Sequence, residues 1–129
     1  MDSDAELIHL KETQIVGRRR KVSQIHAMIA EFELLAAELG REIGTEEDRT
    51  GNHDPMHFAY STYAKAAHGR RDNLKRSTDE LRHQLDAART ALHDAIAEFM
   101  LLAGEREQMQ SGLAGLAPGQ AHAELNRAS

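Results

Sequence analysis

VSQIHAMIAEFELLAAEL, residues 22–39, carries apolar side chains in two rows, each with a spacing of seven residues. The rows are formed by Val22, Ile29 and Ala36 and by Ile25, Phe32 and Leu39. A seven-residue repeat with two apolar positions places both rows on one side of an α-helix, where they can pack against a second helix. The first row extends in both directions along the chain, to Ile8, Ile15 and Ile43. The stretch therefore predicts a long coiled-coil helix.

The second half of the chain repeats this pattern, with Ala67, Leu74, Leu81, Ala88, Ala95 and Leu102 in one row and Leu85, Leu92 and Phe99 in the other. RTGNHDP, residues 49–55, lies between the two halves. Gly51 can end the first helix in a left-handed conformation, and Asp54 and Pro55 suit the N-cap and first position of another helix. Two matched patterns separated by a turn predict a helical hairpin.

The predicted fold is all-α: a long antiparallel two-helix coiled-coil hairpin with a disordered C-terminal tail. The hairpin covers residues 1–109, with a first helix at 4–48, a turn at 49–60 and a second helix at 61–109. The tail covers residues 110–129, where SGLAGLAPG opposes a helix, although a short helix at 120–126 is an alternative. The predicted coiled-coil seam consists of Ile8, Ile15, Val22, Ile25, Ile29, Phe32, Leu39, Ile43, Leu74, Leu81, Leu85, Leu92, Phe99 and Leu102.

The charge and composition of the chain disfavour several classes of protein. A formal net charge of −5 is unfavourable for a general nucleic-acid binder, which needs an excess of Lys and Arg. The chain has no cysteine, and its early acidic residues do not make a secretory leader. Its longest apolar run is far short of the roughly 20 residues that span a bilayer. We expect a cytoplasmic protein with no nucleic-acid partner.

The segment HFAYSTY, residues 57–63, holds Phe58, Tyr60 and Tyr63, three of the five aromatic residues of the chain. The favoured interpretation is that these rings fold over the last heptad, near Ile43 and Ala67, and shield it from water. The alternative is a partner-binding tip. Ser61 is a possible N-cap of the second helix, in which case residues 55–60 form a separate short turn of helix.

Two basic clusters are the best candidates for a partner-binding surface. They consist of Arg18, Arg19, Arg20 and Lys21 in the first helix and Arg70, Arg71, Lys75 and Arg76 in the second. Lys11 and Arg18 fall on the seam row itself, where apolar residues are expected. Their aliphatic stems are predicted to cover the seam while their charges reach water or pair with Glu98 or Glu105. The alternative is that this basic end binds an acidic protein surface.

The sequence predicts no catalytic, cofactor or metal site. His53 and His57 have a spacing of four, but Asp54 and Pro55 between them disrupt a shared helical face. The carboxylates of residues 46–48 are consecutive and read as a solvated charge run. Three leucines, Leu34, Leu35 and Leu101, lie off the seam rows, and they either widen the seam or mark a partner groove.

The residues together resemble the FliJ family of flagellar export proteins, and its alphaproteobacterial branch best. The resemblance covers roughly residues 7–105 and is most specific at DPMHFAYSTYAK, residues 54–65, followed by RRDNLK, residues 70–75. LKE with Gln14 and the run from Arg20 to Phe32 also carry it. The family pattern has a proline after Phe-Ala-Tyr, where this chain has Ser61.

The resemblance implies a non-enzymatic coiled-coil component of the flagellar type III export apparatus. Such a protein is expected to act as a stalk-like coupling factor for the hexameric export ATPase. It is also expected to engage the cytoplasmic domain of the export gate and to escort export chaperones. It would lie in the cytoplasm, associated with the flagellar base and with the membrane only through these partners. The alternative is a self-associating structural coiled coil that scaffolds or spaces other proteins.

Overall fold

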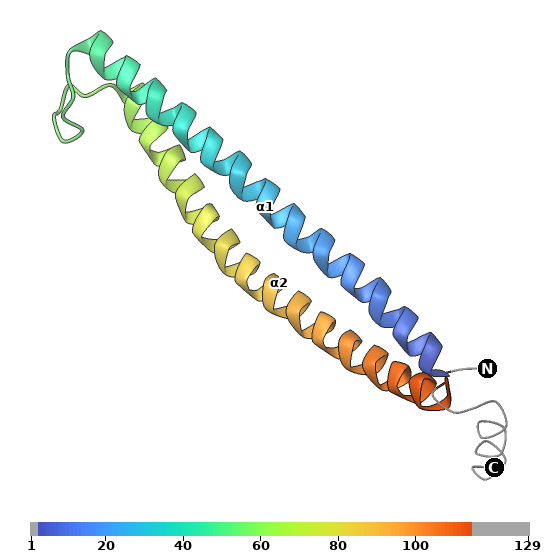
Figure 1. Ribbon diagram of the computed structural model, residues 1–129. Coiled ribbons are helices and arrows are strands. Elements are labelled where there is room, and N and C mark those ends of the chain that lie inside the picture. The colour runs from blue at the N-terminus through green and yellow to red at the C-terminus, as the bar shows by residue number, and fades with distance from the viewer. Residues whose placement is uncertain (1–2, 115–129) are drawn as a thin grey trace. The chain divides into compact units, whose positions relative to one another are not determined.

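The computed structural model describes residues 3–114, with side chains described through residue 112. This part of the chain consists of two helices, α1 (Ser3–Thr50) and α2 (Thr62–Ala114), joined by the turn segment, residues 51–61 (Figure 1). The chain is an all-α, antiparallel helical hairpin, as its periodicity predicts. Both helices are slightly longer than predicted.

The second helix continues through residues 110–114, which the sequence assigned to a disordered tail. Gly112 is the only glycine in this extension, and a single glycine costs a helix about 1 kcal/mol without ending it. The other helix-breaking residues of the predicted tail come later. Residues 115–129, including the possible short helix at 120–126, lie outside the described residues.

The helices are divided between two compact units. The terminal unit comprises Met1–Arg19 with Thr90–Ser129, and the turn unit comprises Arg20–Arg89. In each unit, a segment of α1 packs against a segment of α2. Each unit therefore has its own portion of the coiled-coil seam.

Burial follows the seven-residue rows. All fourteen residues of the predicted seam are buried or half-buried. In the turn unit, Ile25, Ile29, Leu81 and Leu85 form a buried cluster, and Val22, Phe32 and Ala88 pack against it. Such interdigitated apolar pairs supply most of the stability of a two-helix structure, which has no second layer to bury them.

Small residues occupy the part of α2 that follows the turn segment. Ala64 and Ala67 are buried almost completely, and Ile43 of α1 is buried as well. The methyl groups of the two alanines occupy little space at the seam. These buried residues of α1 and α2 lie next to the turn segment, so both helices determine its position.

In the terminal unit, a charged pair crosses between the helices. Lys11 Nζ donates a hydrogen bond to Glu98 Oε2, as the prediction that seam cations pair with Glu98 requires. This bond, the Lys11 charge and the nearby Arg18 charge lower the pKa of Glu98. Arg18 itself is half-buried, and its Nε is buried without a hydrogen-bond partner among the described residues.

Outside the seam the helices are mostly polar, with some exposed apolar side chains such as Leu34 and Leu101. Neither α1 nor α2, as far as the structure describes them, contains a stretch that is long and apolar enough to cross a membrane.

Candidate partner-binding surfaces

Gly51 ends α1 as predicted. Its φ is +72°, in the left-handed region, and its N–H donates to the carbonyl oxygen of Glu47 at 2.8 Å. This single bond closes the last turn of the helix with a residue that has no Cβ to strain. The chain can then leave the helix axis at once.

Two hydrogen-bonded turns follow in place of a helix. His57 N–H donates to the Asp54 carbonyl, and Tyr60 N–H donates to the His57 carbonyl, both at 3.0 Å. Asp54 Oδ1 accepts from Met56 N–H at 2.9 Å, but this bond closes a turn, so the prediction of Asp54 as a helix N-cap is wrong. No helix continues from Asp54 and Pro55, however, because His57 Nδ1 takes the N–H of Ala59 that an α-helix would direct to Pro55.

Side chains fix the shape of this segment as much as its backbone does. Asn52 Oδ1 accepts from Asp54 N–H at 3.1 Å, and Asn52 Nδ2 donates to His57 Nδ1 at 3.2 Å. Since Nδ1 accepts from both Asn52 and Ala59, His57 carries its proton on Nε2. His53 Nε2 lies 2.9 Å from Asp48 Oδ1. The two histidines therefore serve the turn segment, and no three His, Cys, Asp or Glu side chains converge on a metal-sized site among the described residues.

Ser61 is the N-cap of α2. Its Oγ accepts from Ala64 N–H at 3.1 Å and donates to Glu46 Oε1 at 2.8 Å, so the cap is tied to α1. Glu46 also accepts two bonds from Arg49, at 2.6 and 3.0 Å. The Arg49 and Ser61 bonds lower the pKa of Glu46 to about 2. Ser61 thus starts the helix at the position where the family pattern has proline.

Replacing Glu46 by glutamine should make the free energy of unfolding depend less on pH at acid pH. A lowered pKa in the folded chain means that the Glu46 carboxylate stabilises the fold fully above its ordinary pKa of 4.5. This contribution is lost as the pH falls toward about 2. Urea unfolding of both proteins between these limits measures the difference. Glu38→Gln removes the same charge from an exposed position of α1 and should leave the slope close to that of the parent. A parent-like slope for Glu46→Gln would contradict the assignment.

The three aromatic side chains of the turn region have different environments. Tyr60 is buried, with 8% of its surface exposed, as the shielding interpretation predicts. Phe58 is 97% exposed, so that interpretation is wrong for Phe58. Tyr63 is also exposed, and its hydroxyl donates to Glu42 at 3.2 Å. Position 58 lies just inside the second turn, which directs its side chain away from the helices.

Met56 lies on the same exposed segment and was not identified as a site residue from the sequence. It is 90% exposed, in the first of the two turns. The Phe58 ring stacks only on His57, with centroids 4.6 Å apart. We call Met56 and Phe58 the apolar tip. Two large apolar side chains on a hydrogen-bonded segment are typical of a surface that a partner covers.

Tyr60 starts a chain of polar contacts that runs into α2. Its hydroxyl donates to Glu47 Oε2 at 2.8 Å and lies 3.1 Å from His68 Nε2. His68 Nδ1 accepts from Arg71 Nη2 at 3.1 Å, so the histidine proton lies on Nε2, directed to the Tyr60 oxygen. Burial, followed by the contact with Glu47, raises the pKa of Tyr60. Sequence reasoning missed His68, which has no motif of its own.

The basic clusters do not form a single surface. In the first cluster, Arg19, Arg20 and Lys21 are exposed, while Arg18 is the half-buried seam residue. In the second cluster, Arg76 bonds Asn73 of the preceding turn, and Arg70 borders a groove that also contains Tyr63. The structure brings together Arg71 and Lys75, on the other hand, beside a separate hollow.

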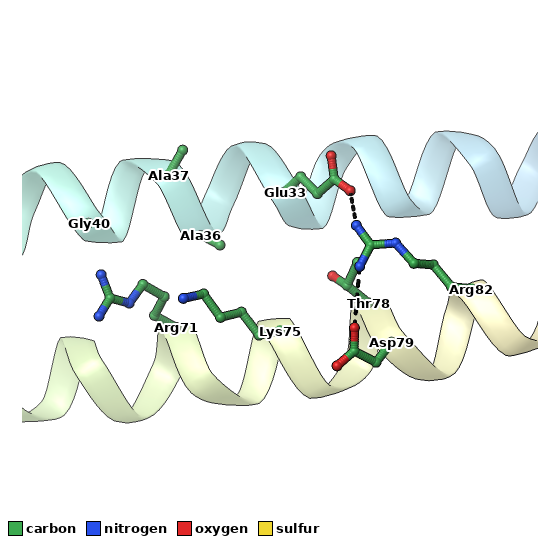
Figure 2. Close-up of a pocket in the computed structure, with 9 residues that line it drawn as sticks. All are labelled: Glu33, Ala36, Ala37, Gly40, Arg71, Lys75, Thr78, Asp79 and Arg82. Atoms are coloured by element: carbon green, nitrogen blue, oxygen red, sulfur yellow. Dashed lines mark hydrogen bonds and ion pairs between the residues drawn. The ribbon is translucent and has the colours of Figure 1, made fainter.

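The hollow lies between α1 and α2 and has a volume of about 580 Å³ (Figure 2). We call it the basic hollow. Its lining residues are Glu33, Ala36, Ala37 and Gly40 from α1 and Arg71, Lys75, Thr78, Asp79 and Arg82 from α2. The α1 side is open opposite Arg71 and Lys75, where it carries Ala36 and Gly40, while Glu33 lies at the Arg82 end. Arg71 and Lys75 extend from α2 toward this open side.

Two of the three leucines off the seam rows, Leu34 and Leu101, do not widen the seam. Leu34 and Leu101 are exposed to 58% and 65%, and Leu35 is exposed to a smaller extent. Leu35 borders the groove of Tyr63 and Arg70, together with Phe32, Leu39 and Leu74. The interpretation as a widened seam is therefore wrong for Leu34 and Leu101, which remain apolar surface on the helices, whereas Leu35 flanks the seam.

The chain gives no match in any of three comparisons, with models of protein families, with curated proteins and with solved structures.

Proposed function

We propose that the chain is a non-enzymatic coiled-coil component of a flagellar type III protein export apparatus. In this role it couples the hexameric export ATPase to protein delivery and escorts export chaperones. It acts in the cytoplasm at the flagellar base and also contacts the cytoplasmic domain of the export gate. The observation that carries the proposal is the apolar tip, because it lies within residues 54–65, the stretch that most specifically resembles the FliJ family.

The physical chemistry of the apolar tip supports a role in binding a protein. The side chains of Asn52, Asp54 and His57 form hydrogen bonds that stabilise the turn segment. Met56 and Phe58 contribute nothing comparable to it and are almost fully exposed. An anchor that is already held in one conformation loses little entropy when it enters a pocket. Aromatic anchors of this kind commonly dominate the binding energy of an interface.

The alternative function is a self-associating coiled-coil scaffold. The exposed Leu34 and Leu35 favour it, because a second copy would bury apolar surface that lies outside the seam. The two functions predict different masses in solution. A scaffold forms dimers or four-helix bundles from the chain alone, and a coupling factor forms complexes with other proteins.

The first experiment is the light-scattering mass of the chain alone, with the purified export ATPase, and with the cytoplasmic domain of the export gate. The proposal expects a monomer that joins the ATPase hexamer at a defined stoichiometry and binds the gate domain. Self-association without binding to either protein would replace the proposal with the scaffold function.

Truncating the apolar tip should weaken such a complex. We expect the double variant Met56→Ala/Phe58→Ala to bind its partner at least 30-fold more weakly, which corresponds to about 2 kcal/mol. Its unfolding midpoint should stay close to that of the parent, because both side chains are exposed. The control Met100→Ala/Leu101→Ala removes two other exposed apolar side chains, and its affinity should stay within about 2-fold. An equal loss in both variants would show that the apolar tip is not the anchor.

A further inference from the structure

We propose that the basic hollow binds a carboxylate side chain from an acidic segment of another protein. Two of its three positive charges, those of Arg71 and Lys75, have no acidic partner among the described residues. Arg71 is half-buried, and its Nε is buried without a hydrogen-bond partner among the described residues. Within the described part of the chain, its guanidinium makes one hydrogen bond, to His68 Nδ1 at 3.1 Å. Lys75 makes no hydrogen bond or ion pair within the described part of the chain.

The arrangement is costly for the chain alone. Arg71 lies on the row of Thr78 and Leu85, at a seam position where an apolar side chain would pack. A partly buried charge without a counter-ion destabilises a fold, because it loses hydration and gains no partner. An anion between Arg71 and Lys75 would remove this penalty. Binding of an external anion between Arg71 and Lys75 would therefore stabilise the fold.

Arg82 closes the other end of the hollow. It donates to Glu33 at 2.6 Å and lies 3.3 Å from Asp79, so its charge is already shared between two carboxylates (Figure 2). The three groups sum to one negative charge, which stands at a distance from Arg71 and Lys75 along the hollow. This charge orients an incoming acidic side chain toward the two unpaired cations. It also repels a doubly charged phosphate more strongly than a single carboxylate.

The open wall fits the rest of an acidic side chain. Ala36 offers its methyl group to the CH₂ groups of such a side chain, and Gly40 leaves space for its approach. A Cβ added to Gly40 would lie 3.6 Å from Arg71 Nη1, so the glycine is adjacent to the cation. No aromatic side chain lines the hollow, so a nucleotide base would find nothing to stack on. A carboxylate on an apolar stem is thus the ligand that this lining suits.

The test titrates a labelled peptide of alternating Glu and Ala residues into the full chain at low salt, followed by NMR. The proposal expects saturable binding with shifts concentrated at Gly40, Arg71 and Thr78. The Gln-Ala peptide should produce no such shifts. Inorganic phosphate at the same concentration should compete poorly. Equal shifts from phosphate would overturn the assignment to a protein carboxylate in favour of a free anion.

Matched variants distinguish binding of the peptide in the basic hollow from attraction to the overall charge of the chain. Arg71→Gln/Lys75→Gln should weaken the peptide at least 10-fold. Arg70→Gln/Arg76→Gln removes the same charge from the same helix outside the hollow and should change affinity by less than about 2-fold. Equal losses would reduce the effect to net charge and overturn the proposal.

Two further variants test whether a loss of peptide binding results from a disturbed fold. Gly40→Ala retains both cations while it adds a methyl group 3.6 Å from Arg71 Nη1, and it should weaken binding of the peptide as well. Arg71→Leu should raise or preserve the unfolding temperature, because it replaces an uncompensated seam charge by an apolar side chain. A large fall in unfolding temperature would show that Arg71 serves the fold, and the proposal would fail.

Discussion

Replacing Ile25 by alanine should lower the free energy of unfolding by about 2–4 kcal/mol. Ile25 is 3% exposed and belongs to the buried cluster with Ile29, Leu81 and Leu85. Truncation removes three carbons and leaves a cavity between two helices. Both sides of the cavity are backed by helix, so it closes only if the helices move together. Urea unfolding followed by far-ultraviolet circular dichroism measures the loss.

The control is Leu34→Ala, nine residues along the same helix. Leu34 is exposed, and its truncation should change the free energy of unfolding by less than about 0.5 kcal/mol. Because leucine and isoleucine each lose three carbons on truncation to alanine, burial is the main difference between the two variants. Similar effects at both positions would contradict a seam-centred core and would place apolar contacts on the outer face of α1.

Periodicity alone predicts the helices and their seam well. A spacing of seven selects the buried face of each helix, and Ile25 and Leu81 follow that rule because nothing but the facing helix is available to bury them. Local chemistry is equally informative at Gly51, where the left-handed residue ends α1 as expected. These features depend on a few neighbouring residues, so one sequence is sufficient to identify them.

The basic hollow could not be predicted in the same way. The seam row of Leu85 continues toward the turn through Thr78 and Arg71. Neither residue is apolar, so a search for apolar repeats does not identify them. The hollow also requires small residues on the opposite helix, at Ala36 and Gly40. The register between the two helices decides whether these positions face each other. A sequence contains the residues but not that register.

The apolar tip escaped prediction for another reason. Hydrophobicity predicts that Phe58 is buried, and its exposure results from a set of hydrogen bonds made by Asn52, Asp54 and His57. Each of these bonds is plausible on its own. Their combination forms two turns where the Asp54–Pro55 pair suggested a helix, and only the combination decides which aromatic ring faces water.

Tyr60 is expected to hold this segment to the helices, so Tyr60→Ala should cost about 3 kcal/mol. Its ring is buried, and its hydroxyl lies between Glu47 and His68. Tyr60→Phe retains the ring and should cost about 1 kcal/mol, because Glu47 and His68 lose a shared partner. Thermal unfolding measures both changes. Hydrogen exchange at the Met56 and Ala59 amides should accelerate more in Tyr60→Ala than in Tyr60→Phe.

Tyr63→Ala is the matched control, since Tyr63 is exposed and its one hydroxyl bond, to Glu42, is long at 3.2 Å. We expect it to change stability by less than about 1 kcal/mol and to leave exchange in the turn segment unaltered. If Tyr60→Ala proved as mild as Tyr63→Ala, the turn segment would owe its shape to its internal bonds alone. The apolar tip would then be preorganised without help from the helices, and partner binding by Tyr60→Ala would match that of the parent. A cost near the expected value, with weaker binding, would show that the helices position the apolar tip through this one ring.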